Sequence, residues 1–175
     1  MGIGGGHINK QIEDNLCKIY NEKLYLGTGF LCKIPYADQY NLTPVLISNR
    51  HIFREQDFLE NKTIKITFKN DSITKQLKIT SERKIYNSNE NDIVTIGILK
   101  TDNIDNFLDY EDVNLNINKK NIYILQYKKE KKGEAIYGKI TEVNGSEIRH
   151  NCNIEGGWDE GPILLRETLP YKLEI

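Results

Sequence analysis

Cysteine is scarce in this chain of 175 residues, and its three copies are odd in number and widely spaced. Cys17, Cys32 and Cys152 stand among apolar residues, which is not the arrangement of a secreted disulfide framework. The sequence therefore indicates a reducing compartment. We expect an intracellular, cytoplasmic protein that is not secreted, and a virus-encoded or virion protein fits the same expectation.

Long apolar runs and a charge excess are also missing. No stretch approaches the roughly 20 apolar residues of a membrane span, and the first residues lack the basic and apolar regions of a signal peptide. The 24 basic residues nearly balance the 25 acidic ones, so nothing in the net charge attracts a polyanion. We expect neither a membrane nor a nucleic-acid partner.

The sequence contains no Cys or His pair with the spacing of a zinc site. His7, in the N-terminal arm, and His150, on a predicted strand before Cys152, are not expected to be metal ligands. We therefore expect no metal and no cofactor.

Short runs of β-branched residues, broken by Asn, Asp, Gly and Pro, dominate the chain and predict strands. We place them near 15–20, 24–33, 44–48, 63–68, 74–80, 92–98, 121–127, 134–143, 147–152, 162–166 and 171–175. Turns are expected at 87–91 and, most clearly, at Asn144-Gly145, where a hairpin is predicted. So many short strands favour an all-β sandwich or barrel.

Segment 101–120 is acidic and poor in β-formers, and it separates six predicted strands from five. We interpret it as a connector inside one domain that covers 1–175. An N-terminal arm or short helix at 1–14 and a first half at 15–100 precede it, and a second half at 121–175 follows.

Three features follow one another along the chain. His51 comes just after the apolar strand predicted at 44–48, and Asp92 opens another apolar strand. A Gly-rich turn at 155–161 precedes the strand predicted at 162–166. Each feature alone is ordinary, but a histidine, an acid and a Gly-rich turn in this order are the arrangement that chymotrypsin-type triads use.

The same residues carry a resemblance to a known family. Residues 27–53 and Asp92-Ile93-Val94 resemble the segments around the catalytic His and Asp of intracellular trypsin-like serine peptidases, and 152–164 resembles their nucleophile turn. The resemblance implies a chymotrypsin-like fold of two antiparallel, six-stranded-type β-barrels, with the second barrel truncated at its C-terminal end. It also implies that His51 and Asp92 occupy catalytic positions and that Gly157 occupies the oxyanion-hole position.

The departure from the family lies at the third catalytic position. When the turn is aligned on Gly157 and Pro162, Asp159 stands where the family keeps its nucleophilic serine, with Trp158 before it and Glu160 after it. Residues 158–161 include no Ser, Thr or Cys, so a shift of the alignment restores no nucleophile. His51, Asp92 and Asp159 are then the positions of a vestigial triad.

These residues predict a catalytically inactive peptidase homologue that is reused for protein binding or assembly. Two alternatives stay open: a residual hydrolase that uses His51 and Asp92, and a structural subunit of a viral or cellular particle. His51 and Asp92 could equally persist as a hydrogen-bonded pair that joins the two barrels, and Trp158 could plug the core or form a ligand platform. We expect a protein partner, or a homo- or hetero-oligomer formed through an open strand edge near 162–175.

Overall fold

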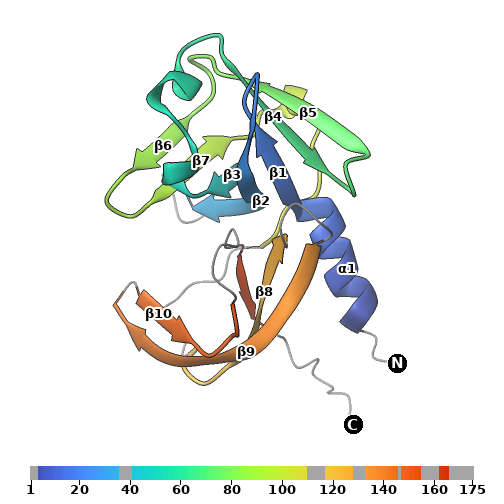
Figure 1. The fold of residues 1–175 in the computed structure, drawn as a ribbon, viewed down its shortest axis with the longest axis vertical. Coiled ribbons are helices and arrows are strands. Elements are labelled where there is room, and N and C mark those ends of the chain that lie inside the picture. Colours follow the sequence, from blue (N-terminus) through green and yellow to red (C-terminus); the bar gives the residue numbers. More distant parts are fainter. Residues whose placement is uncertain are drawn as a thin grey trace. The chain divides into compact units, whose positions relative to one another are not determined.

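The computed structural model of the chain describes residues 4–35, 41–109, 117–127, 133–145, 147–154 and 162–165 (Figure 1). The described residues form one α-helix, three short 3-10 turns and eleven strands. The chain divides into two compact units between Tyr110 and Glu111, inside the segment 101–120. Each unit is described by itself below.

The first unit contains the helix and seven of the strands. Its elements in chain order are α1 (Gly4–Asn15), β1 (Leu16–Tyr20), β2 (Tyr25–Pro35), β3 (Leu42–Ser48), η1 (Arg50–Ile52), η2 (Glu55–Phe58), β4 (Thr63–Phe68), β5 (Ile73–Lys78), β6 (Ile85–Ser88), β7 (Ile93–Gly97) and η3 (Lys100–Asp102). All seven strands join one antiparallel sheet in the order β5-β4-β1-β2-β3-β7-β6.

The two outermost strands of this sheet, β5 and β6, are consecutive in the chain. The segment between them is only 79–84, so the chain itself brings the opposite edges of the sheet near each other. Twisted sheets curl naturally, and this connection makes the sheet curl around one interior (Figure 1).

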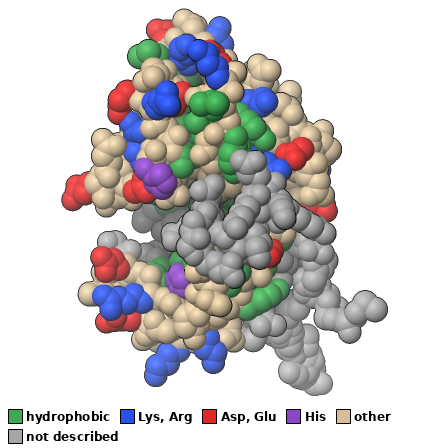
Figure 2. Space-filling model, viewed as in Figure 1, with side chains coloured by type: hydrophobic (Ala, Val, Ile, Leu, Met, Phe, Trp, Pro, Cys, Tyr) green, Lys and Arg blue, Asp and Glu red, His purple; other side chains and the backbone are tan. Residues whose placement is uncertain are grey.

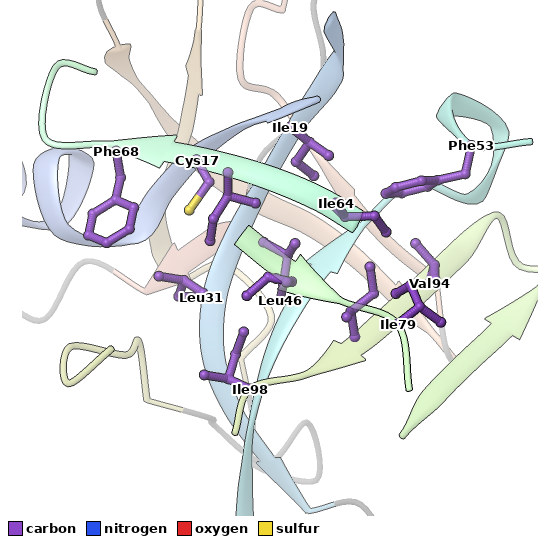
Figure 3. Packing of buried hydrophobic residues seen from close by; sticks show 13 residues of the cluster. Cys17, Ile19, Leu31, Leu46, Phe53, Ile64, Phe68, Ile79, Val94 and Ile98 are labelled. Carbon is purple, nitrogen blue, oxygen red and sulfur yellow. The ribbon is translucent and has the colours of Figure 1, made fainter. Parts of the chain in front are cut away.

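The interior of the first unit is apolar because alternate residues of each strand face it. Ile19, Leu31 and Leu46 come from three neighbouring strands and are almost fully buried, and Figure 3 shows them converging with Ile64 and Val94. Full burial of such a side chain stabilises a fold by about 1.5–3 kcal/mol. This shared core fixes the register of the strands, because a shift by one residue would turn its members toward solvent.

Helix α1 occupies most of the predicted N-terminal arm, which the sequence left open between an arm and a short helix. Ile12 is buried, and the backbone N–H of Lys69 donates to the carbonyl of Glu13 at 2.8 Å. The Lys69 ammonium also lies 3.4 Å from the buried carboxylate of Asp14. These contacts attach the end of the helix to the turn between β4 and β5.

The described part of the second unit is a four-stranded antiparallel sheet. Its strands are β8 (Asn121–Tyr127), β9 (Gly133–Asn144), β10 (Glu147–His150) and β11 (Ile163–Leu165), in the order β10-β9-β8-β11. The long strand β9 pairs with β8 through its first half and with β10 through its second half. Ile122, Ile124 and Ile140 are almost fully buried and form a separate apolar core.

Two glycines of the second unit show why the sequence folds as it does there. Gly145 has a φ of 62° in the turn between β9 and β10, which confirms the hairpin predicted at Asn144-Gly145. Gly138 of β9 lies against the residues that follow β10, where an added Cβ would come within 2.6 Å of the Cys152 sulfur. Only glycine permits this close approach.

The expected fold class is confirmed, because the described chain is nearly all β, with a curled sheet and a second sheet, as in a chymotrypsin-like two-barrel fold. Every strand predicted between 15 and 166 has a counterpart among the described residues. The strand predicted at 171–175 lies outside them.

Cys17, Cys32 and Cys152 are free thiols and all are buried. Within the described part, no helix is long and apolar enough to cross a membrane.

One strand was not predicted. Residues 85–88 form β6, although the sequence pattern predicts a turn that begins at Asn87. Asn87 and Ser88 are turn-forming residues, but here they pair with Val94 and Ile93 of β7. Pairing with an already ordered strand overrides the weak local preference of these residues.

A buried ion pair holds the connection between β5 and β6. Arg83 and Asp102 have side chains only 3% and 7% exposed, and Nη1 of Arg83 lies 2.7 Å from Oδ2 of Asp102. Arg83 also donates from Nε to the carbonyl of Lys78 at the end of β5 and from Nη1 to that of Gly97 in β7, each at 2.8 Å. One guanidinium thus links the edge strand β5 to β7, the neighbour of the opposite edge strand β6.

We predict that Arg83→Met lowers the free energy of unfolding by about 3–5 kcal/mol, because it leaves the Asp102 carboxylate buried without its cation. Urea unfolding followed by circular dichroism measures the change. Arg149→Met is the matched control, since Arg149 pairs with Glu142 at 3.3 Å on the surface and should contribute about 1 kcal/mol or less. Equal losses in the two variants would contradict a special role for the buried pair.

Candidate functional site

His51 lies in η1, directly after the end of β3. Strand β3 carries Leu46 and Ser48 into the interior, and the chain then turns at Asn49 into a short 3-10 turn. The His51 side chain is 67% exposed. Figure 2 shows a histidine on the surface of the first unit with an acidic side chain beside it.

Asp92 is the last residue of the turn between β6 and β7. Ser88 and Ile93 form the final pair of the hairpin, so Asp92 closes a four-residue loop. Its φ of 49° is left-handed, a conformation that Asp and Asn adopt more readily than most other residues. Asp is one of the few residue types that suit this position, and it also supplies a carboxylate.

The Asp92 carboxylate holds His51 at two points. Oδ2 lies 2.7 Å from Nδ1 of the His51 ring, and Oδ1 accepts the backbone N–H of His51 at 2.8 Å. An ionised carboxylate only accepts hydrogen bonds, so the ring proton belongs on Nδ1. The other ring nitrogen, Nε2, has no hydrogen-bond partner within the part of the chain that the structure describes.

Two further contacts from the same short segment fix Asp92. The side-chain amide of Asn49 donates to Oδ2 at 3.2 Å, and the backbone N–H of Arg50 donates to the Asp92 carbonyl at 3.2 Å. Three consecutive residues, 49 to 51, thus bind one aspartate. This arrangement orients the imidazole, as the acid of a catalytic triad does.

Desolvation raises the pKa of Asp92, but the hydrogen bonds from the ring and backbone of His51, together with that from Asn49, outweigh it. The pKa of Asp92 therefore lies below its ordinary value of 3.8. The carboxylate stays ionised at neutral pH and is available to hold the ring.

Arg50 is the residue of this site that the sequence analysis missed. Its side chain is 7% exposed, lies over the Phe58 ring and donates to the carbonyl of Phe53 at 2.8 Å. It also donates to the Asn87 side chain in β6 and pairs with Glu55. Arginine side chains are usually exposed, so no local signal indicates that Arg50 is buried. Its contact with Asn87 in β6 connects η1 to the hairpin that carries Asp92.

His51 and Asp92 both belong to the first unit, so their hydrogen bonds join two parts of that unit. The sequence analysis had considered a pair that joins the two barrels, and the position of both residues before Tyr110 corrects it. Asp159, Gly157 and Trp158 lie outside the described residues.

The second unit contains one further candidate group near the Gly-rich turn, the thiol of Cys152. It is buried, and burial raises its pKa, so it is not a ready nucleophile. His150 is engaged locally, since its Nδ1 accepts the backbone N–H of Cys152 at 3.2 Å. Among the residues described, no group of three or more His, Cys, Asp or Glu could hold a metal ion.

The lowered pKa of Asp92 predicts an acid-dependent contribution to stability. A depressed folded-state pKa stabilises the fold above the ordinary value of 3.8, and this contribution disappears as the pH falls through the lower, folded-state value. Urea unfolding between pH 6 and about pH 2 should therefore show a steeper acid loss in the natural protein than in Asp92→Asn. Glu90→Gln, in the same loop, is the control and should keep the steep loss. Identical acid profiles for the natural protein and Asp92→Asn would contradict this account.

Comparison with known proteins gives a structural answer only. No family model matches the sequence, and no curated protein does. Among solved structures, Deg5 superimposes with a TM-score of 0.62 at 14% identity, over 92% of this chain and 79% of that one. The Rv3671c protease in an inactive form gives 0.57 at 13% identity over 90% and 75%. A serine protease of a human pathogenic astrovirus gives 0.55 at 14% identity over 87% and 76%. The chain therefore has the fold of the trypsin-like serine proteases.

Proposed function

We propose that this chain is a trypsin-like peptidase homologue without peptidase activity, and that it acts by binding protein. The observation that carries the proposal is an oriented His51–Asp92 pair in a sequence whose Gly-rich turn contains no hydroxyl or thiol. The fold and the base are kept, but the residue that would form the covalent intermediate is missing.

The chemistry of the turn supports inactivity. In the triad mechanism, histidine takes the proton of a serine hydroxyl, which then attacks the scissile carbonyl. A carboxylate at Asp159 has no such proton to give, and its acyl product would be a labile mixed anhydride. Covalent peptide hydrolysis is therefore closed to a chain with Asp159 at that position.

Negative charge also opposes the other catalytic group of the turn, the oxyanion hole. The backbone N–H of Gly157 would stabilise an oxyanion, but Asp159 and Glu160 follow it closely in the sequence. A negative charge about 4 Å away costs up to about 4 kcal/mol at an effective dielectric of about 20, and solvent reduces this. Asp159 and Glu160 thus disfavour the oxyanion that forms during peptide hydrolysis.

The His51–Asp92 pair has a structural role that explains its retention without catalysis. Its hydrogen bonds attach the β6–β7 hairpin to η1, and the left-handed residue that closes the hairpin is itself Asp92. Removal of the pair would weaken the attachment of this hairpin to η1. A protein reused for binding would keep such a pair for the shape of its surface.

A second candidate function is a residual hydrolase in which His51 activates a bound water. The exposure of the ring favours it, because Nδ1 is held by Asp92 while Nε2 has no partner among the described residues. Turnover of a fluorescent casein substrate that His51→Ala abolishes would support this function over the first.

The decisive test is labelling with a fluorophosphonate, which reacts with activated serine. We expect no labelling of the natural protein, since the turn has no serine to react. The double variant Asp159→Ser, Glu160→Gly should gain labelling if Asp159 stands at the nucleophile position, and adding His51→Ala should remove it again. Labelling of the natural protein would contradict inactivity, and a double variant that stays unlabelled would contradict the placement of Asp159.

A further inference from the structure

Strand β5 ends the sheet of the first unit, so one of its sides has no neighbouring strand among the described residues. The direction of its backbone groups follows from the residue after it. Ile79 accepts from the N–H of Asn61 and donates to the carbonyl of Lys62, both at 2.8 Å, so its backbone groups point toward the β4 side. Alternate residues of a strand point the same way.

The backbone groups of Thr74, Gln76 and Lys78 must therefore point away from β4. The carbonyl of Lys78 does so, because it accepts Nε of Arg83. Thr74 and Gln76 are exposed, and their backbone groups meet no partner on that side within the described residues. They form an open edge of two residues that can accept another strand.

The side chains beside this edge are basic. Ile64 and Ile66 of β4 face the core, so Lys65 between them faces outward. Lys65 pairs in register with Gln76 and with Tyr20, which places Lys18 and Lys78 on the same outer surface. We call Lys18, Lys65 and Lys78 the lysine face.

No carboxylate occupies an outward position of β1, β4 or β5, although the chain as a whole has a net charge of −1. The nearest acid, Asp71, is in the turn between β4 and β5 and is already bound by Lys18 at 2.8 Å and by Thr67. Lys65 lies over the Tyr20 ring, 4.5 Å from its centroid. Lys18 is paired with Asp71 and only 13% exposed, so Lys65 and Lys78 supply the accessible positive charge of this face, which complements an anionic partner.

We propose that the β5 edge and the lysine face bind an extended acidic segment of a partner protein, which adds as a strand beside β5. The proposal rests on the proposed protein-binding function but uses no residue of the His51 site. Backbone pairing would supply affinity, and acidic side chains on the outer surface would meet Lys78 and Lys65. A second copy of the same edge is disfavoured, because its own lysines would face these ones.

The test uses fluorescence anisotropy of a fluorescein-labelled peptide of alternating Glu and Val with the full chain. We expect binding that weakens as salt rises, and a loss of about tenfold or more in Lys78→Glu. Gln76→Pro should also weaken binding, because it removes only an N–H that points away from β4. Lys139→Glu, an exposed lysine of the second unit, is the charge-matched control and should bind as the natural protein does.

Thermal unfolding of each variant separates loss of binding from loss of fold. Hydrogen exchange with the peptide bound should slow at the amides of Thr74 and Gln76, which a purely electrostatic contact would leave unchanged. Equal effects of Lys78→Glu and Lys139→Glu would overturn the proposal, as would no binding. Tighter binding of an oligothymidylate that displaces the peptide would overturn the assignment to a protein segment. None of these outcomes depends on fluorophosphonate labelling, so the two proposals fail separately.

Discussion

The arrangement of the candidate site depends on the carboxylate of Asp92. The carboxylate accepts hydrogen bonds from the ring and the backbone N–H of His51 and from the side-chain amide of Asn49. The backbone carbonyl of Asp92 accepts another from the N–H of Arg50. Because these donors belong to one short segment, a single side chain sets both the position of the segment and the tautomer of the imidazole. Asp92 makes these contacts from a left-handed backbone conformation, which Asp adopts more readily than most residues.

Two buried arginines extend this constraint into the fold. Arg50 links η1 to Asn87 in β6, and Arg83 links the end of β5 to β7 through backbone carbonyls. Both are satisfied by several acceptors, which is the condition under which a buried charge is tolerated. These polar contacts reinforce the apolar packing of the curled sheet near its edge strands, and they also hold the hairpin that carries Asp92.

The two proposals concern different parts of the chain. An oriented histidine without a nucleophile argues for loss of catalysis, and an open basic edge argues for recognition of an acidic strand. They are compatible because β5 pairs with β4, whereas the His51 site is built on β3, β6 and β7. A peptidase fold offers such separation, since its strands have edges that catalysis does not use.

The sequence by itself determined the all-β class, the positions of ten described strands, the Asn144-Gly145 hairpin and the placing of His51 and Asp92 at strand ends. These follow from residue alternation and turn chemistry, which are local. Only the tertiary structure decided that Asn87 and Ser88 form β6, that Arg50 and Arg83 are buried, and that His51 meets Asp92 within one unit. Strand pairing and burial of charge depend on partners far away in the chain, and no local preference of the residues encodes them.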